Sequence, residues 1–468
     1  MQIVTMKFGG TSVGSGEAIS QVVDIVHDCS THIAEHVVVV VSAMSGVTDL
    51  LRDGTLSAAG GDPNRFRQIA DQLRDQHHKA AAEISEQGSP ELLQQVDAMI
   101  DSYLRFCSSV YVLGEATPRA LDYTMGLGEQ INARLVAAGL KQAGLSAEAV
   151  DATELIVTDD RHQNAAPLIP ETEERIREVL LPRLEGGLLP VVTGFIGATR
   201  DGITTTLGRG GSDYSAALLG TCLGSDEVWI WTDVDGVMSA NPKLVPEARS
   251  IKRLSYREVS ELAYYGAKVL HPKTIRPVIE AGIPLRVKNT FNPAHPGTLI
   301  LAEHESDGII KAVTAIPGVS MINVEGKGML GVPGIAARTF GAVARTETSV
   351  LLISQASSEQ SICFIVPQES APVVVEALTQ EFEREIARFD IDQIWSQRDI
   401  TIITVVGAGM RGTPGIAGRL FSAVGKEGIN IIAIAQGSSE CSISFTVKSD
   451  QCQGTLQAIH TLMLEWDE

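Results

Sequence analysis

Residues 204–215 read Thr204-Thr205-Thr206-Leu207-Gly208-Arg209-Gly210-Gly211-Ser212-Asp213-Tyr214-Ser215, and the rest of the chain is organised around them. Three threonines precede a glycine-rich turn and small apolar residues follow it, which predicts a loop that enters the N-terminus of a helix. Glycine lets the backbone approach a ligand closely, and free N–H groups at a helix N-terminus attract an anion. Ser212 or Asp213 is the expected N-cap, and Arg209 can bind a carboxylate or phosphate through two parallel hydrogen bonds. We therefore predict an anion site; a plain glycine-rich surface turn is the alternative.

Buried strands that end in small polar turns lie on both sides of this stretch. We expect them at residues 3–8, 37–41, 191–197, 227–231 and, as the last of the domain, 287–290. The five consecutive valines at 37–41 are typical of a central parallel strand. Strands alternate with helical segments, which predicts an open, mostly parallel sheet with helices on both faces. Ligands bind such sheets at the carboxyl ends of the strands, where Lys7 precedes Gly9 and Gly10. An exposed lysine at a strand end is the alternative interpretation of Lys7.

Two further segments carry titratable side chains in helical surroundings. Residues 63–107 have a helical pattern broken near Gly88-Ser89-Pro90. His77 and His78 are adjacent, so they point in different directions from a helix, and we expect a solvated helix face rather than a metal site. Glu129 follows a predicted glycine turn, where an acid most often caps a helix.

Composition limits the class of protein. A chain of 468 residues is expected to hold about two to four domains. Its net charge of −20 argues against nucleic acid or an anionic membrane as partner. The N-terminus lacks a signal-peptide pattern, and no apolar run is long enough to span a bilayer. Six cysteines without a C-x-x-C pair indicate reduced thiols, no structural metal and a cytoplasmic protein.

The C-terminal third contains an internal repeat. Pro333-Gly334-Ile335-Ala336 recurs as Pro414-Gly415-Ile416-Ala417, and Gln355 recurs as Gln436 at the same offset. Each copy is expected to form a strand, a Gly/Pro turn, a helix and two more strands. One such unit cannot cover its own sheet, so the two copies are expected to pack together. We place the boundary with the preceding domain between Gly297 and Gly308.

Six motifs, in this order, resemble those of aspartate kinases over essentially the whole chain. They are residues 7–12, 41–46, 192–197, 205–215, 231–234 and 265–272. The resemblance implies an amino-acid-kinase catalytic domain at residues 1–300, an α/β fold, followed by two ferredoxin-like ACT domains. One ACT domain would comprise residues 316–394. The other, in which it is nested, would comprise residues 309–315 plus 395–468.

The implied reaction is transfer of the γ-phosphate of Mg-ATP to the β-carboxylate of L-aspartate. It yields 4-phospho-L-aspartate, the first step towards lysine, threonine and methionine. Donor and acceptor are both anions, so catalysis needs charge neutralisation and alignment. The resemblance implies that Lys7 lies over the transferring phosphoryl group, with Asp213 orienting the lysines. Arg209 would bind the α-carboxylate of aspartate and Glu129 its ammonium group. The rest of the substrate pocket would consist of Thr48, Phe195, Gly210, Gly211 and Ser212.

The resemblance also implies an ATP site. Its residues would be Lys7, Gly9, Gly10, Thr232, Asp233, Met238, Lys243, Lys268 and Val269. Mg²⁺ would bridge the phosphates, and we expect few or no direct protein ligands to the metal. Met238 stands where the family usually has tyrosine, and Lys243 replaces an arginine, so its planar fork is lost. Weaker nucleotide binding is the resulting hypothesis.

The repeat resembles the ACT domains of threonine-sensitive aspartate kinases, including the kinase half of bifunctional aspartate kinase–homoserine dehydrogenases. Gln355 and Gln436 are the expected effector-binding side chains, because an amide both donates and accepts hydrogen bonds. Capping of strand ends is the alternative role. Threonine is the favoured effector and lysine a possible one, with a homodimer or dimer of dimers formed through the ACT domains. No dehydrogenase domain follows residue 468, so a monofunctional form is expected.

Three rival interpretations make different predictions. N-acetylglutamate, glutamate or a nucleoside monophosphate could replace aspartate, but Arg209 and Glu129 together favour a zwitterionic amino acid. An amino-acid sensor with a decayed kinase domain would be expected to lack its catalytic side chains, yet Lys7, Asp213 and Lys268 are all present. A Rossmann dehydrogenase would need a strand followed by G-x-G-x-x-G and a ribose-binding acid, which the sequence lacks.

Overall fold

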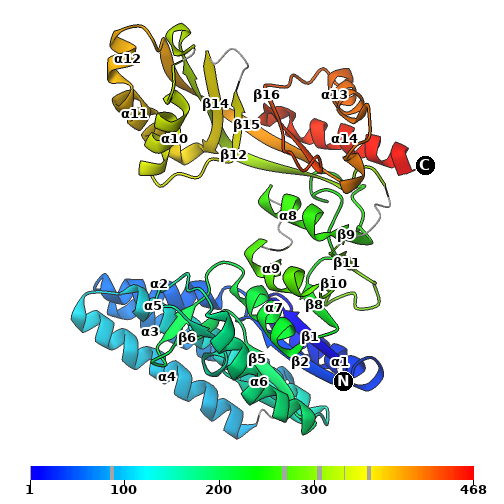
Figure 1. Ribbon diagram of the computed structural model, residues 1–468. Helices are drawn as coiled ribbons and strands as arrows, with labels where there is room; N and C mark the ends of the chain where they lie inside the picture. Colours follow the sequence, from blue (N-terminus) through cyan, green and yellow to red (C-terminus); the bar gives the residue numbers. More distant parts are fainter. Residues whose placement is uncertain are drawn as a thin grey trace. The chain divides into compact units, whose positions relative to one another are not determined.

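The computed structural model describes residues 2–84, 89–265, 270, 272–302, 308–330, 332–355 and 360–467. The chain divides into two compact units, which are followed in Figure 1 by their colours. The first unit comprises Met1–Val237, Ser250–Tyr256 and Leu270–His304. The second unit comprises Met238–Arg249, Arg257–Val269 and Glu305–Glu468. Two short segments from the middle of the chain, Met238–Arg249 and Arg257–Val269, therefore belong to the second unit although residues on both sides of them belong to the first.

An eight-stranded sheet forms the centre of the first unit, in the order β3-β5-β2-β1-β8-β10-β11-β9. The strands are β1 (Ile3–Phe8), β2 (His36–Val41), β3 (Ala147–Val150), β5 (Leu189–Thr193), β8 (Glu227–Thr232), β9 (Arg253–Ser255), β10 (Leu285–Asn289) and β11 (Thr298–Leu301). All pairs from β3 to β10 are parallel, and β11 runs antiparallel to β10. The predicted mostly parallel sheet is confirmed, with the valines of β2 buried at its centre. The strand expected to be the last is followed by β11, so that part of the prediction is wrong.

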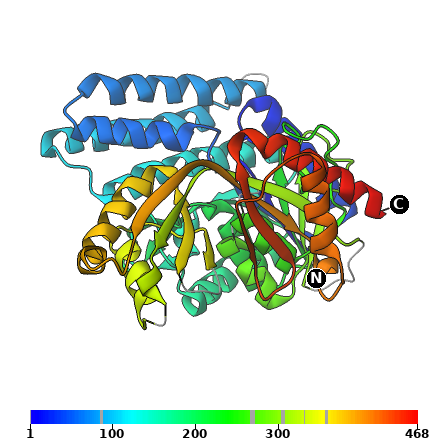
Figure 2. The ribbon, with the colours of Figure 1, turned by 90° about the horizontal axis from the view of Figure 1, so that it is seen from above.

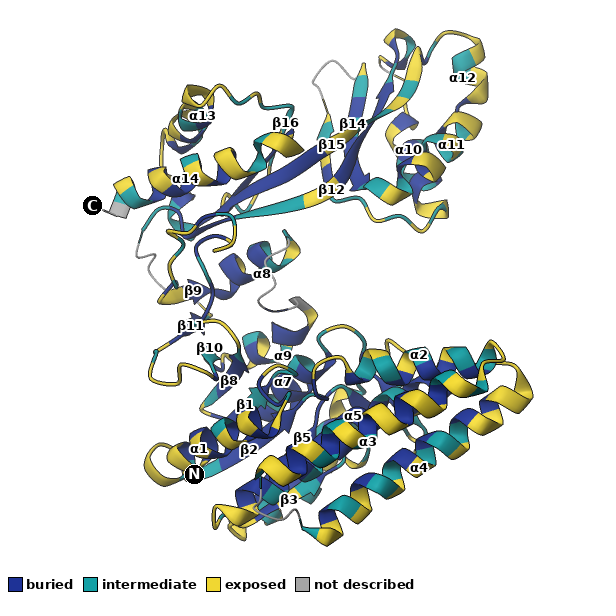
Figure 3. Ribbon diagram, turned by 180° about the vertical axis from the view of Figure 1, so that it is seen from behind, coloured by how far each residue is buried: buried dark blue, intermediate teal, exposed yellow. Residues whose placement is uncertain are grey.

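Helices cover both faces of this sheet. On one face α1 (Gly16–His32) and α5 (Pro118–Gln142) pack against Met6 and Phe8 of β1 and the tryptophans of β8. On the other face α7 (Gly211–Leu223) packs beside Thr5 and Lys7. The remaining helices of the first unit are α2 (Val47–Ala59), α3 (Pro63–Ile84), α4 (Pro90–Leu113), α6 (Ile169–Glu185) and α9 (Pro272–Ala281). Figure 3 shows the buried stripe along α3 and α4 that their helical spacing of apolar residues produces.

Two details of the helical layer differ from the prediction. His77 is completely buried, and its Nδ1 donates to the carbonyl of Leu73 at 2.6 Å. Only His78, which contacts Asp97, lies nearer the surface. Gly126 and Gly128 lie inside α5 rather than in a turn. A Cβ on Gly128 would come within 2.8 Å of the Ala43 side chain, so this glycine allows the β2–α2 turn to approach α5.

A six-stranded antiparallel sheet forms the centre of the second unit, in the order β13-β14-β12-β15-β17-β16. Figure 2 shows the chain from above, with this C-terminal part in yellow to red. Its strands are β12 (Ala312–Glu325), β13 (Leu352–Gln355), β14 (Ser361–Pro367), β15 (Gln393–Val406), β16 (Ala433–Gln436) and β17 (Ser442–Lys448). The first copy of the repeat contributes β13, β14 and the helices α10 (Ile335–Arg345), α11 (Ala371–Glu381) and α12 (Glu383–Ala387). The second copy contributes β16, β17 and the helices α13 (Ile416–Lys426) and α14 (Cys452–Asp467). The two copies therefore share one sheet.

Both copies use the same core packing. Phe340 of α10 contacts Phe364 of β14 edge-on at 5.5 Å between ring centroids, and Phe421 of α13 contacts Phe445 of β17 in the same way at 5.7 Å. β12 and β15 run through both halves: Ala312–Ile316 pairs with Ile402–Val406, and Val319–Glu325 pairs with residues 393–400. No helix within the described ranges is long and apolar enough to cross a membrane.

Candidate active site

A cavity of about 570 Å³ opens in the first unit where β1 and β2 end. Ten of the predicted site residues line it: Lys7, Gly10, Thr48, Glu129, Phe195, Arg209, Gly210, Gly211, Ser212 and Asp213. Gly9 does not; its N–H donates to the carbonyl of Trp231 at 3.1 Å, which fixes the turn after β1. The cavity thus gathers residues that are far apart in sequence at the sheet edge where parallel folds bind ligands.

Two helix N-termini meet this cavity. The N-cap of α2 is Gly46 (φ 81°) and that of α7 is Gly210 (φ 74°), and neither makes a side-chain capping hydrogen bond. The expected N-cap at Ser212 or Asp213 is therefore wrong: α7 begins at Gly211, because Gly210 adopts the left-handed conformation that ends the loop. The uncapped N–H groups and the positive ends of the two helix dipoles favour an anion in the cavity.

The loop that follows β5 packs closely against α7 because it contains a glycine, Gly194. A Cβ on Gly194 would lie 2.6 Å from that of Ser212, so this glycine lets the end of β5 contact the first turn of α7. Phe195 follows with a φ of 69° and donates its N–H to Ser215 at 3.1 Å. The strand expected over 191–197 is broken here. Its second part joins a separate three-stranded sheet with strands β4 (Val157–Thr158), β6 (Ile196–Thr199) and β7 (Thr204–Thr206).

Charges of both signs line the cavity. Lys7 Nζ lies 2.6 Å from Asp213 Oδ1, and both side chains are largely buried. Arg209 is exposed, and its guanidinium makes no ion pair or hydrogen bond with a residue that the structure describes. Arg52 and Asp49 of α2 also line the cavity; the sequence interpretation missed both. An unpaired arginine beside an ion-paired lysine can bind an anion without first losing a partner.

Glu129 is the most strongly perturbed acid of the cavity. Its side chain is 3% exposed, and its Oε2 has no hydrogen-bond partner. Burial raises the pKa of Glu129 to about 8, an effect that hydrogen bonds from the backbone and the charge of Lys7 offset only in part. A buried carboxyl with a free oxygen can accept a hydrogen bond from a cationic ligand.

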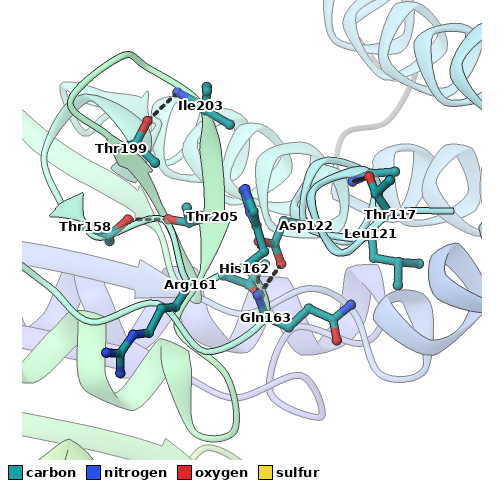
Figure 4. A network of polar contacts seen from close by, with 12 residues as sticks. Thr117, Leu121, Asp122, Thr158, Arg161, His162, Gln163, Thr199, Ile203 and Thr205 are labelled. Atoms are coloured by element: carbon teal, nitrogen blue, oxygen red, sulfur yellow. Dashed lines mark hydrogen bonds and ion pairs between the residues drawn. The ribbon is translucent and has the colours of Figure 1, made fainter.

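A buried network beside the cavity was not predicted (Figure 4). Asp122 of α5 is completely buried and accepts hydrogen bonds from His162 Nδ1 at 2.6 Å and from the backbone N–H of Gln163 at 3.0 Å. Thr206 Oγ1 donates to the same carboxylate at 2.6 Å. Gln163, which has a φ of 70°, and Thr206 both line the cavity. Asp122 therefore fixes the loop that forms one of its walls. The signal for this role in the sequence was the position of Asp122, an acid among the apolar residues of a helical segment.

Replacing Asp122 with alanine should lower the free energy of unfolding by roughly 2–4 kcal/mol. The change removes the acceptor of three donors, of which the Thr206 hydroxyl is buried and the other two are partly buried, and leaves them without this partner. Urea denaturation followed by circular dichroism measures the effect. Asp160→Ala is the matched control, since Asp160 is exposed in the same loop, and it should change the free energy by less than about 0.5 kcal/mol. Equal effects of the two changes would contradict the anchoring role.

Several predicted residues lie outside this cavity. Thr232 is the last residue of β8, and its Oγ1 donates to Oδ1 of the following Asp233 at 3.2 Å. Met238 and Lys243 belong to the second unit, and Lys268 and Val269 lie outside the described residues. Gln355 and Gln436 end β13 and β16, respectively, and are exposed. Gln436 lines a cavity of about 680 Å³ together with the N-terminal turn of α13. In the described part of the chain, no three His, Cys, Asp or Glu side chains are grouped to hold a metal.

Fold and cavity together define a kinase-type α/β domain joined to a pair of regulatory-type domains, and comparisons with known proteins agree. The amino acid kinase family matches residues 2–289, and the ACT domain matches residues 322–382 and 403–462. Bifunctional aspartokinase/homoserine dehydrogenase 1 of Zea mays is 38% identical over 97% of this chain and 50% of the relative. Aspartokinase 3 of Arabidopsis thaliana is 33% identical over 99% of this chain and 82% of the relative.

Crystal structures of aspartokinase III from E. coli are similar over 99% of this chain and 100% of theirs, at 28% identity. The complex with aspartate and ADP has a TM-score of 0.81, and the complex with lysine and aspartate one of 0.79. The chain belongs to the aspartokinase branch of the amino acid kinase family. It spans about half the length of the bifunctional relatives that it matches.

Proposed function

We propose that this chain is an aspartate kinase, which transfers the γ-phosphate of Mg-ATP to the β-carboxylate of L-aspartate. One observation carries the proposal: a lysine–aspartate pair, a free arginine and a buried acid line one cavity at the N-termini of two helices. The product is 4-phospho-L-aspartate. This reaction is the first step towards lysine, threonine and methionine.

The substrate assignment follows from two titratable side chains of the cavity that have no ionic partner. Arg209 binds the α-carboxylate, because its exposed guanidinium has no other acceptor among the described residues. Glu129 accepts hydrogen bonds from the α-ammonium group through its free Oε2. Thr48, Phe195, Gly210, Gly211 and Ser212 complete the pocket. A nucleoside monophosphate has no ammonium group to pair with Glu129, so an amino acid is favoured.

Lys7 and Asp213 act on the transferring group. The acceptor is already an anion at neutral pH, so the reaction needs no strong base, only charge neutralisation and alignment. Lys7 supplies a positive charge within a largely buried site, where it is worth more than in water. Asp213 holds the ammonium group of Lys7 in position through the 2.6 Å ion pair. The N-terminus of α7 adds partial positive charge on the same side.

The ATP site in this proposal contains Lys7, Gly9, Gly10, Thr232, Asp233, Met238 and Lys243. Lys268 and Val269 complete the set. Mg²⁺ enters with the nucleotide and is held by its phosphates. Since Lys243 offers a point charge in place of an arginine fork, ATP binds more weakly than in relatives with arginine. An ATP titration that gives the same affinity as in relatives with arginine would contradict this weaker binding.

Regulation acts through the second unit. We assign one ACT domain to residues 316–394 and the other to residues 309–315 plus 395–468, with the kinase domain at 1–300. Threonine is the proposed inhibitor, bound by Gln355 and Gln436, and subunits associate through these domains as a dimer or dimer of dimers. Effector binding inhibits by favouring one of two conformations of the enzyme. Gln436 supports this assignment, because it lines a cavity with the uncapped N-terminus of α13, which can bind a carboxylate.

The decisive experiment measures ATP turnover with L-aspartate, with and without L-threonine or L-lysine. Aspartate-dependent turnover that threonine suppresses supports both assignments. Turnover suppressed by lysine alone retains the kinase and overturns the effector. The absence of aspartate-dependent turnover overturns the proposed function in favour of an amino-acid sensor. N-acetylglutamate, glutamate and UMP serve as alternative acceptors in the same assay.

Gln436→Ala should raise the threonine concentration needed for half-maximal inhibition by about tenfold, which corresponds to one lost hydrogen bond to a charged ligand. The basal kcat should not change, because Gln436 is not part of the kinase cavity. Inhibition curves at fixed aspartate and ATP provide the measurement. Gln380→Ala, on the exposed side of α11, is the matched control and should leave the curve unchanged. An unaltered curve for Gln436→Ala would assign this glutamine to strand capping instead.

A further inference from the structure

A second cavity of about 330 Å³ lies in the first unit, on the sheet face opposite Lys7. Successive residues of a strand point to opposite faces. Lys7 contacts α7, whereas Phe8 stacks on Trp231 at 5.8 Å between ring centroids. The second cavity is bounded by α1, by the tryptophans of β8, by Lys288 of β10 and by the turn that follows β10. These elements can be followed in Figure 1 around β1 and β8. We call it the α1-side pocket.

Lys288 places a positive charge in this pocket without a counterion. Its Nζ lies 5.2 Å from the ring centroid of Trp229 and 4.9 Å from that of Trp231. It makes no ion pair with any residue that the structure describes. Partial burial lowers the pKa of Lys288 below its ordinary value. The charge of Arg286 adds to this effect, and the charges of Glu227 and Asp28 offset it only in part. An anion in the pocket would supply the missing charge.

The indole N–H of Trp231 is a second unpaired donor. Trp231 is 2% exposed, and its Nε1 is buried without a hydrogen-bond partner. The neighbouring Trp229 differs, because its Nε1 donates to the Glu227 carboxylate. An unsatisfied buried N–H destabilises the folded state until it finds an acceptor. The same ring therefore carries both an unpaired donor and the unpaired ammonium group over its face.

The remaining walls of the α1-side pocket indicate which kind of ligand body fits it. Ile25 and Cys29 are buried, and Ile33, Pro293 and Ala294 are exposed at the opening. Asp24 and Asp28 of α1 lie at the rim and are exposed; Asp28 contacts His32. An exposed carboxylate is well screened by water, so it repels an anion only weakly. The pocket thus combines the Lys288 ammonium group, a tryptophan ring whose N–H is unpaired, an apolar wall and acids at its edge.

We propose that the α1-side pocket binds a small carboxylate with a branched apolar body. The Lys288 ammonium and the Trp231 indole N–H bind the carboxylate, while the apolar body packs against Ile25 and Ile33. A simple organic acid and an apolar α-amino acid share this chemistry. Asp24 distinguishes them, because only the amino acid has an ammonium group for it to bind. The site does not depend on the proposed kinase activity, so it is tested by binding alone.

The test is titration of the full chain with 4-methylpentanoate and with L-leucine, followed by tryptophan fluorescence and calorimetry. We expect saturable binding of at least one probe, and none of the uncharged 4-methylpentanamide. Lys288→Met should weaken binding at least about tenfold, and Trp231→Phe by a smaller factor. Tighter binding of leucine that Asp24→Asn abolishes identifies an amino acid. Equal or better binding of 4-methylpentanoate identifies an organic acid.

Two further variants serve as controls for this binding test. Lys288→Arg retains the positive charge and should retain binding, which separates a lost ligand contact from a damaged fold. Lys252→Met removes an exposed lysine of the same unit and should bind as the unaltered chain does. The proposal is overturned if neither probe binds saturably, or if Lys288→Met binds with unchanged affinity.

Discussion

Replacement of Lys7 with methionine should lower kcat for aspartate-dependent ATP turnover roughly 100- to 1,000-fold. This is the loss observed when one preorganised donor to a developing charge is removed. Lys7 is the only lysine among the described residues that line the cavity, and burial excludes the water that would otherwise screen it. The KM for aspartate should change little, because Arg209 and Glu129 are proposed to bind that substrate. Steady-state kinetics with each substrate varied in turn measures both parameters.

Two controls accompany this prediction. Lys79→Met removes a lysine that is 79% exposed and should leave kcat unchanged. Circular dichroism should show that the Lys7→Met protein is folded, since the change leaves Asp213 without its ion-pair partner. A folded Lys7→Met enzyme that keeps more than about a tenth of kcat would refute the assigned role of Lys7.

Glu129 should make aspartate binding depend on pH. The pKa of the Glu129 carboxyl is about 8, so below pH 8 the empty site holds a proton that must leave before the carboxylate can bind the substrate ammonium group. The KM for aspartate should therefore fall as pH rises from 6.5 to 8.5, by roughly 20-fold, and level off above the pKa. Initial rates over this range, at saturating ATP, measure the effect.

Glu129→Gln separates this effect from other titrations. The amide cannot ionise, so the variant should bind aspartate weakly at every pH, and its KM should no longer change over the range. Glu148→Gln, at an exposed position of β3, should retain the full pH dependence. A Glu129→Gln enzyme with an unaltered KM profile would show that another group controls the titration.

Much of the fold could be predicted because its signals are local. The run of valines in β2 has the hydrophobicity of a strand buried on both faces. Lys7 lies near the end of β1, just before a glycine turn, and Arg209 stands between two glycines. The errors occur where tertiary packing overrides a local rule. Gly126 and Gly128 suggested a turn, yet both lie inside α5. Gly128 is a glycine for a packing reason, because the Ala43 side chain occupies the space that a Cβ would need. Glu129 is therefore a buried helix residue rather than a cap.

The parts of the site that were missed depend on contacts between distant segments. The pairing of Asp122 with His162 joins α5 to a loop after β4, and neither residue lies in a motif. His77 was expected at the surface because adjacent histidines resemble a polar face, but it lies on the buried side of α3 together with Phe66 and Leu73. No pattern within one segment records which side chains meet from another, so such residues emerge only when the elements are assembled.

The long strands β12 and β15 have a consequence for the order in which the chain can fold during its synthesis. Val319–Glu325 of β12 needs β14 on one side and β15 on the other, and β15 is made after all the helices of the first copy. Until Gln393–Val406 leaves the ribosome, β12 has an unpaired edge, which is a template for aggregation. The first copy is translated earlier but cannot complete its sheet alone, so a chain that stops before β15 would leave an exposed edge and no finished regulatory half.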